Sequence, residues 1–86
     1  LFFVDLPNYY ERRQIFEIHL RRRGWKPEMF DVEKLANNTE EYSGAEIEQI
    51  VNSAIIESYG QGRMLTDDDL EQSRDRTVPL SVTMED

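Results

Sequence analysis

Apolar residues recur at helical spacing in the first part of this chain. Between Pro7 and Gly24 no helix breaker appears, so residues 8–23 are expected to form a helix. Gly24 is a natural C-terminal cap, and Trp25-Lys26-Pro27 is expected to be a loop because proline cannot continue the helix. The residues that carry the helical spacing are Tyr9, Ile15, Phe16, His19 and Leu20.

A short second helix is predicted after Asp31. Aspartate is a good N-cap, because its side chain can accept a hydrogen bond from the free amides of the first turn. Val32, Leu35 and Ala36 then form one apolar stripe. The run Asn37-Asn38-Thr39 weakens the end of this helix.

The third helix has the most specific start signal in the chain. Ser43 and Glu46 form the S-x-x-E capping box, in which each side chain accepts from the other residue's backbone amide. Tyr42 and Ile47 flank the box at the two positions of a hydrophobic staple. The helix is expected to end near residues 60–62. Its apolar positions are Ile47, Ile50, Val51, Ala54, Ile55 and Tyr59.

A fourth helix and two extended ends complete the predicted architecture. Thr66 and Asp69 form a weaker capping pattern for a helix that runs to about Arg76, with Leu70 as its clearest core residue. Residues 1–6 are a short apolar run closed by proline, which is typical of a buried strand. Residues 77–84 alternate in polarity and contain a proline, which allows an extended tail or an edge strand.

The sequence therefore predicts an all-α fold with an extended piece at each end. Residues 8–76 are expected to form the four-helix body, and residues 77–86 an extended tail. Because no other clear strand precedes the tail, residues 1–7 are expected to be the last strand of a larger domain from which this chain was cut.

Composition excludes several classes of partner and site. Ten Lys and Arg against eighteen Asp and Glu give a net charge of -8, which disfavours nucleic acids and anionic membranes. The chain has no cysteine, and His19 is its only histidine, so neither a disulfide framework nor a thiolate or His-based metal site is expected. No apolar run approaches the ~20 residues of a membrane span. We expect a soluble, intracellular chain that is monomeric on its own.

Three acids and one serine invite catalytic or metal-binding interpretations that their context does not support. Asp67-Asp68-Asp69 lacks the alternating ligands, central glycine and final glutamate of a calcium loop. Acids in the first turn of a helix are expected from its dipole alone. Ser43 is explained by capping, and no base and orienting acid can be assembled around one histidine. No catalytic residue and no metal ligand is predicted.

Two features of the helices leave alternatives open. Five of the ten basic residues lie on the first helix: Arg12, Arg13, Arg21, Arg22 and Arg23. They form either a solvated face or a patch for an acidic partner. Gly44 occupies the first position of the third helix, where almost any other residue would favour the helix more. A glycine there suggests the close approach of another helix or of a ligand.

Two separated motifs resemble the end of an AAA ATPase module. LFFVDLPNYYERRQIFEIHL resembles the last core strand, a proline and the first helix of the lid, and EEYSGAEIEQIVNSAIIES resembles the start of the third lid helix. The resemblance covers residues 1 to about 70. With the final TVPLSVTMED, the chain is most similar to an uncharacterised AAA family of cyanobacteria and algal plastids. The matching positions are Pro7, Arg12, Ile15, His19, Gly44 and Ala45.

The resemblance implies a nucleotide site shared with a large α/β domain. In this family ATP or ADP, with Mg²⁺, lies between that domain and the lid. Ile15 and His19 would face adenine and ribose, and Gly44 and Ala45 would pack against the nucleotide. Ala45 and Glu46 stand where related branches carry a sensor arginine. Asn8 replaces the frequent aspartate after the proline and should cap the helix equally well.

The resemblance also implies that this chain does not act alone. It contains no phosphate loop, acidic Mg²⁺ strand motif or arginine finger, so it is not expected to hydrolyse ATP, or to bind it well, in isolation. The implied partners are the chain's own large domain and neighbouring subunits of a ring homo-oligomer, in the cytoplasm or the plastid stroma. The alternative is a free-standing helical interaction module that binds a partner through the basic first helix.

Overall fold

Four α-helices and one short 3-10 helix make up the part of the chain that the structure describes, residues 6–77 of a computed structural model. The elements are α1 (Tyr9–Arg22), the 3-10 helix η1 (Pro27–Met29), α2 (Val32–Asn37), α3 (Gly44–Gly60) and α4 (Asp67–Arg76). No strand occurs between residues 6 and 77, which confirms the all-α prediction. The strand expected over residues 1–7 falls largely outside the described range, and Leu6 and Pro7 are not part of a strand.

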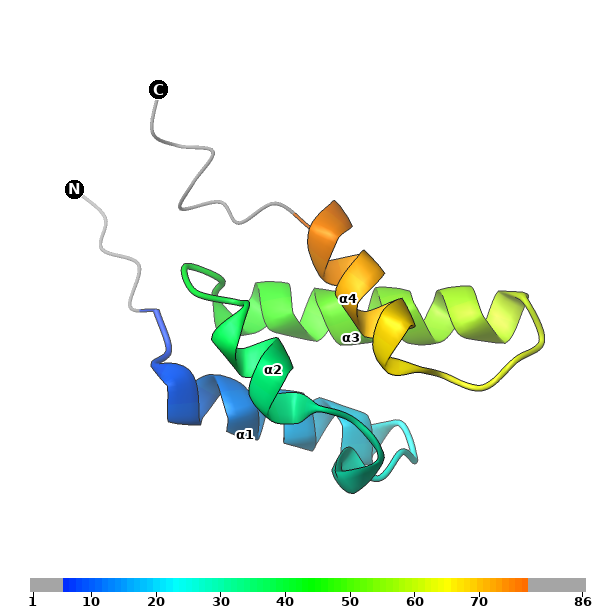
Figure 1. The fold of residues 1–86 in the computed structure, drawn as a ribbon, viewed down its shortest axis with the longest axis horizontal. Helices are drawn as coiled ribbons and strands as arrows, with labels where there is room; N and C mark the ends of the chain where they lie inside the picture. The colour runs from blue at the N-terminus through cyan, green and yellow to red at the C-terminus, as the bar shows by residue number, and fades with distance from the viewer. Residues whose placement is uncertain (1–5, 78–86) are drawn as a thin grey trace.

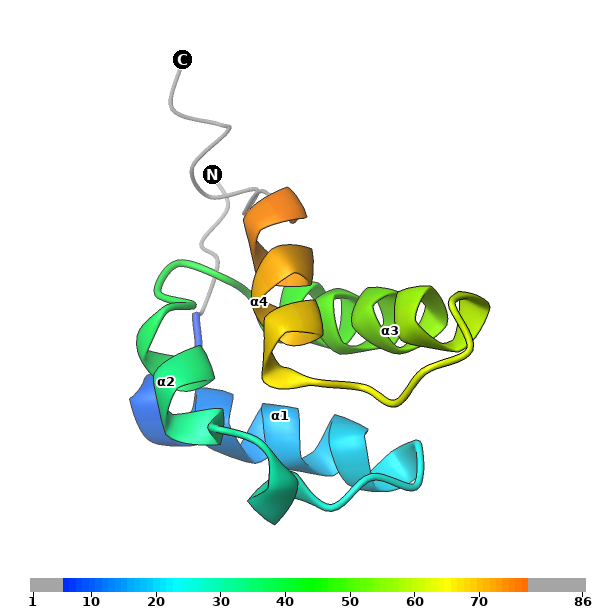
Figure 2. The same ribbon diagram turned by 45° about the vertical axis from the view of Figure 1, so that its right-hand side comes forward.

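The two long helices, α1 and α3, run in the same direction along the length of the molecule (Figure 1). The short helices α2 and α4 pack on them, α2 against α1 and α4 across α3, as the turned view also shows (Figure 2). As a consequence, the N-terminal ends of α1 and α3 lie at one end of the molecule and their C-terminal ends at the other (Figure 1).

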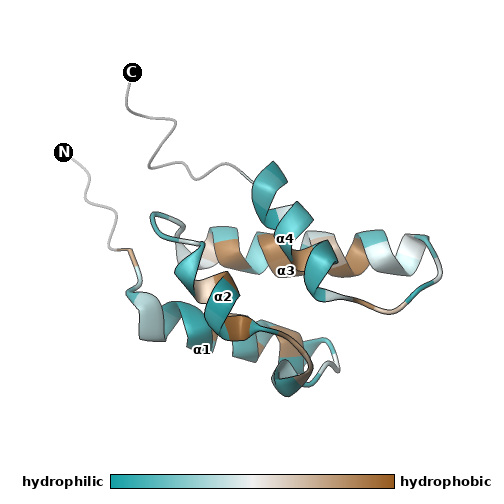
Figure 3. Cartoon of the chain, viewed as in Figure 1, coloured by the Kyte–Doolittle hydropathy of each residue, from teal (hydrophilic) through white to brown (hydrophobic). Residues whose placement is uncertain are grey.

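One apolar core joins α1, α2 and α3. Hydrophobic residues concentrate on α3, whereas the ribbon of α4 is mostly hydrophilic (Figure 3). Trp25 and Phe30, which flank η1, meet edge to face with ring centroids 6.1 Å apart. The side chains that are wholly shielded from solvent in this core are Phe16, Leu20, Ile47, Ile50, Val51, Ala54 and Leu70.

Each of the four α-helices begins at a side-chain cap. Asp31 accepts a hydrogen bond from the Lys34 amide, as predicted. The predicted capping boxes start α3 at Ser43 and α4 at Thr66, and a further one starts α1 at Asn8, where only a simple cap was expected. These caps satisfy amides that have no partner within the helix, so they set where each helix starts.

Two sequence-based expectations about burial are wrong. Tyr59 was placed on the apolar face of α3, but its side chain is 86% exposed, and Ser58 is buried there instead. Arg12 was grouped with the basic residues of a solvated or partner-facing surface, but it is buried, at 7% exposure. Arg21, Arg22 and Arg23 are exposed, as that surface requires.

Polar contacts, rather than apolar burial, fasten most of α4. Its only buried apolar residue is Leu70, and next to it the Ser73 hydroxyl donates to the Ile50 carbonyl of α3 at 2.8 Å. At the C-terminal end, the Tyr42 hydroxyl donates to the carbonyl of Thr77 at 2.7 Å. Because one leucine buries little area, these bonds, which give the buried Ser73 and Tyr42 hydroxyls their acceptors, hold α4 in place.

The N-terminal end of α4 is held by an ion pair that the sequence pattern did not indicate. Two guanidinium nitrogens of Arg63 donate to the two carboxylate oxygens of Asp69, both at 2.6 Å. Asp69 also accepts from the backbone amide and hydroxyl of Thr66. Arg63 in the first place, and Thr66 after it, hold the pKa of the Asp69 carboxyl below its usual range.

This lowered pKa predicts a specific dependence of stability on pH. A carboxyl whose pKa is depressed in the folded state stabilises the fold above its unfolded pKa of about 3.9. That stabilisation is lost as the pH falls through the folded pKa. Urea titrations from pH 7 downwards should therefore show Asp69→Asn less stable than the wild type at neutral pH, with the difference shrinking in acid. The exposed neighbour Asp68→Asn is the control and should show no comparable pH-dependent difference. A difference for Asp69→Asn that stays constant with pH would contradict the assignment.

Candidate functional site

A pocket of about 430 Å³ lies where the chain enters α1, beside the start of α3. The linker residues Leu6 and Pro7 contribute one part of its lining, and Gly44 contributes the first residue of α3. The lining residues from α1 are Glu11, Gln14, Ile15 and Ile18. The pocket exists because α1 and α3 run in the same direction and both begin at this end of the molecule.

Capping fixes both helix starts that border the pocket. The Asn8 side chain accepts from the Glu11 amide at 2.9 Å, and the Glu11 carboxylate accepts from the Asn8 amide at 2.8 Å. At the start of α3, the Ser43 hydroxyl oxygen accepts from the Glu46 amide at 3.2 Å, and the Glu46 carboxylate accepts from the Ser43 amide at 2.8 Å. These local bonds hold the backbone on both sides of the pocket.

Gly44 is not required by the packing of the described residues. Its φ lies outside the left-handed region, and a Cβ built on it would meet only the Ile15 Cδ1 atom, at an ordinary contact distance of 3.6 Å. The alternative that another helix approaches closely at this point therefore has no support among residues 6–77. Nothing among residues 6–77 therefore explains the glycine at the first position of α3.

The structure brings together two of the four residues that the sequence singled out. Ile15 is half-buried and lies against Gly44 in the pocket lining. His19 is half-buried one turn further along α1, and Ala45 is exposed at the second position of α3. Neither His19 nor Ala45 is among the residues that line the pocket.

Sequence reasoning missed the other lining residues, although a signal for some of them was present. Glu11, Gln14, Ile15 and Ile18 follow the i, i+3, i+4, i+7 spacing of one helix face. Ile18 is 44% exposed, which marks that face as incompletely covered. A search for apolar residues on a second, exposed face of the first helix could have found it.

The charges around this pocket suit a neutral ligand group. Its lining contains one acid, Glu11, whose carboxylate already accepts from the Asn8 amide, and it contains no Lys, Arg or His. Aliphatic side chains and the Gln14 amide make up much of the remainder. Such a lining can pack against a planar or apolar group and offer it a few hydrogen bonds, but it supplies no cationic side chain for a phosphate.

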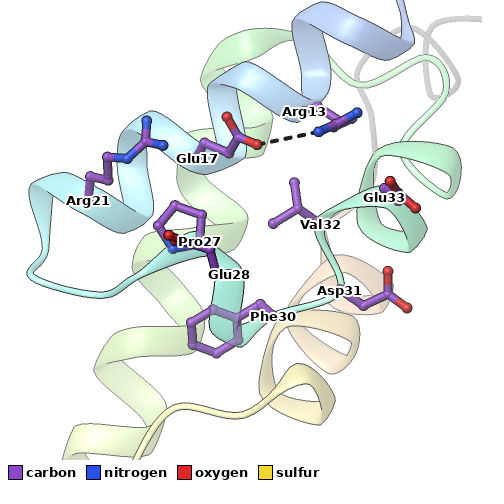
Figure 4. Close-up of a pocket in the computed structure, with 9 residues that line it drawn as sticks. All are labelled: Arg13, Glu17, Arg21, Pro27, Glu28, Phe30, Asp31, Val32 and Glu33. Carbon is purple, nitrogen blue, oxygen red and sulfur yellow. Dashed lines mark ion pairs between the residues drawn. The ribbon is translucent and has the colours of Figure 1, made fainter.

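A second pocket, of about 510 Å³, lies between α1, η1 and the start of α2 and has a different character (Figure 4). Arg13 and Glu17 pair within α1 at 3.7 Å along one side of it, and Arg21 follows them on the same helix. Glu28, Asp31 and Glu33 give its other side an acidic character. None of the four residues singled out from the sequence lies in this pocket.

An apolar groove of about 790 Å³ lies at the opposite end of the molecule from the Gly44 pocket. It is formed where α1 and α3 end, and Ile56, Tyr59 and Met64 in its lining are 68%, 86% and 63% exposed.

No group of three or more potential metal ligands occurs within residues 6–77. Over the same range, no helix has both the length and the apolarity that spanning a membrane demands.

The described residues form a small all-α domain with a pocket at one end whose lining contains no basic residue. The model of the AAA+ lid domain matches residues 30–72, and the chain belongs to this family. The match covers the second half of the lid-like resemblance, including the capping box and α3.

Relatives of known sequence agree with this assignment. The chain is 40% identical over 84 residues to the uncharacterised AAA domain-containing protein ycf46 of Trieres chinensis, covering 94% of this chain and 16% of that protein. It is 36% identical over 86 residues to the ycf46 protein of Pyropia yezoensis, covering 96% and 17%. It is also 36% identical over 76 residues to the ATP-dependent zinc metalloprotease FtsH of Acidothermus cellulolyticus, covering 87% and 11%. The chain thus spans about a sixth of the ycf46 proteins, and the resemblance stated from the sequence is confirmed.

A glycine exchange tests whether the fold itself needs Gly44. Because Gly44 has an ordinary φ and space for a methyl group, Gly44→Ala should leave the free energy of unfolding unchanged or raise it by up to about 1 kcal/mol. The matched control is Gly24→Ala. Gly24 has φ +85°, and forcing alanine into that conformation should cost about 1–2 kcal/mol. Denaturant unfolding of both variants gives the comparison. Destabilisation by Gly44→Ala equal to that by Gly24→Ala would show that the glycine is structural.

Proposed function

We propose that this chain is the helical lid of an AAA ATPase and that the Gly44 pocket faces the base and ribose of bound ATP or ADP. The observation that carries this proposal is Gly44 itself. It is a glycine at a helix start where neither its backbone conformation nor its neighbours require one, and it lies beside a half-buried isoleucine in a pocket lined by no basic residue. A nucleoside needs such a lining, whereas its phosphates need cations.

In this proposal each of the four residues named from the sequence has a part at the nucleotide. Ile15 packs against one face of the adenine, and Gly44 lets the base approach the backbone of α3. His19 and Ala45 lie next to the pocket rather than in its lining. They would contact the nucleotide only when the large domain completes the site.

The described residues supply binding and orientation, and the phosphoryl chemistry belongs to the large domain. Phosphoryl transfer requires a phosphate-binding loop, and Mg²⁺ held by that domain would neutralise the charge on the phosphates. The lid would close when nucleotide is bound and open after hydrolysis. We propose that the intact protein works as a ring of identical subunits in the plastid stroma or the cytoplasm, in line with the resemblance to algal plastid proteins.

The motion of the lid would reach a neighbouring subunit through the far end of α1. The fourteen residues of α1 span about 20 Å, with the Gly44 pocket at the N-terminal end and Arg21, Arg22 and Arg23 at or beyond the C-terminal end. A small rotation about the nucleotide therefore displaces these exposed cations the most. We propose that they contact an acidic surface of the next subunit.

Enlarging Gly44 in the intact ATPase tests the nucleotide site. Gly44→Leu would fill the space beside Ile15, so it should weaken ATP and ADP binding by tenfold or more, about 1.4 kcal/mol. Gly60→Leu, at the other end of the same helix, is the matched control, because open space surrounds the position of its Cβ. Titration with a fluorescent ADP analogue measures both. Equal binding by the two variants would favour the alternative, an interaction module without a nucleotide site.

Charge reversal tests the proposed contact between subunits. Changing Arg21, Arg22 and Arg23 together to Glu should lower the ATPase rate and the assembled fraction of the intact protein, with the larger loss at low salt, because screening weakens exposed charge pairs. Light scattering at two salt concentrations, with ATPase assays, measures both effects. The control is the double change of Lys34 and Arg76 to Glu, since these exposed cations lie on α2 and α4. Unchanged assembly and ATPase rate in the triple variant would contradict the proposal.

A further inference from the structure

Arg12 joins three parts of the molecule through backbone carbonyls. Its Nη1 group donates to the carbonyl of Pro7 in the linker at 2.9 Å, and its Nε group donates to the carbonyl of Ala36 in α2 at 2.8 Å. Ala36 is 24 residues away along the chain. A single planar side chain on α1 therefore bridges the entry of the chain to the C-terminal part of α2.

Burial makes this bridge more than a surface contact. Arg12 is 7% exposed, and removing a guanidinium from water is costly unless its N–H groups find acceptors. An apolar residue of similar length could fill the same space without that cost. What only arginine provides here is a rigid fork that holds two carbonyls at fixed positions relative to each other.

One end of the bridge belongs to the candidate nucleotide pocket. Pro7, whose carbonyl accepts from Arg12, lines that pocket together with Leu6 and with residues of α1 and α3. The local Asn8–Glu11 capping box fixes where α1 begins, but it does not connect the linker to α2. Arg12 supplies that connection.

We propose that Arg12 is a positioning residue for the nucleotide site, an inference that rests on the function proposed above. By tying Pro7 to the body of α1 and α2, Arg12 keeps the linker wall of the pocket in place against Ile15 and Gly44. The linker up to Pro7 then moves with the lid as one body. Arg12 itself does not line the pocket and touches no nucleotide.

Two substitutions in the intact ATPase separate this role from its alternatives. Arg12→Lys keeps the charge and much of the length, but an ammonium group cannot hold both carbonyls in the geometry of the guanidinium fork. Arg13→Lys is the matched control. Arg13 is the next residue of the same helix, is partly exposed, and pairs with Glu17 within α1 rather than with the linker.

Steady-state kinetics and hydrogen exchange give the two measurements. Arg12→Lys should raise the KM for ATP about tenfold while kcat changes by less than about twofold, because the linker wall contributes binding that is equal in the ground state and the transition state. Amide exchange should rise at residues 8–12 and stay unchanged at residues 47–55, the buried part of α3. Arg13→Lys should alter neither KM nor exchange at either segment.

Each of the following outcomes would count against the inference. An unchanged KM in Arg12→Lys overturns it. Faster exchange at residues 47–55, to the same extent as at residues 8–12, also overturns it, because Arg12 would then serve only the stability of the fold. If Gly44→Leu weakens nucleotide binding and Arg12→Lys does not, the role of Arg12 falls and the proposed function stands. If Gly44→Leu has no effect, the proposed function falls first, and the inference falls with it.

Discussion

The packing of α3 against α1 is the interaction on which the rest of this domain depends. The buried residues of α3 face Phe16 and Leu20 of α1 in one core, and α2 and α4 are each attached to one of these two helices. Because the two long helices share a direction, their capped starts come together at one end and create the pocket. If they ran in opposite directions, Gly44 would lie beside the end of α1, and the linker could not contribute to the same cavity.

Apolar packing and hydrogen bonds stabilise different parts of the molecule. Burial of large apolar side chains joins α1, α2 and α3. Because the hydrophobic effect is non-directional, it does not by itself fix the exact positions of these helices. The directional bonds are found at the edges, where Ser73 and Tyr42 hold α4 and Arg12 holds the linker. A small domain with a limited core gains a defined shape from such bonds, since each is directional and gives an acceptor to a side-chain donor that would otherwise be buried without a partner.

The sequence predicted the helices well because their starts depend on local chemistry. The capping patterns at Asp31, Ser43 and Thr66 each involve residues three apart, so the pattern contains both partners. Contacts between residues distant in the chain left no such pattern. Nothing local shows that Arg12 reaches Ala36, and the pair of Arg63 and Asp69 depends on how the loop before α4 folds back.

The candidate site was predictable to a similar degree. Ile15 and Gly44 were named through the family resemblance, and the structure places them in the lining of one pocket. The part of the lining formed by Leu6 and Pro7 was not predicted, and the arginine that bonds to the Pro7 carbonyl was assigned to the surface although it is buried. Tyr59 was misjudged for a different reason. It lies four residues after Ile55, which is only half-buried, whereas the buried stripe of α3 continues from Ala54 to Ser58.

The shared direction of α1 and α3 also gives the domain an electrical polarity that no side chain reveals. Each helix dipole places roughly half a positive charge at its N-terminus and half a negative charge at its C-terminus, so the two add at both ends of the molecule. At the pocket end, the carboxylates of Glu11 and Glu46 in the first turns of α1 and α3 offset this positive pole. At the far end, Arg21 and Arg22 oppose the negative pole of α1. The last turn of α3 has no basic residue, so its negative pole is the one that no side chain of either long helix offsets.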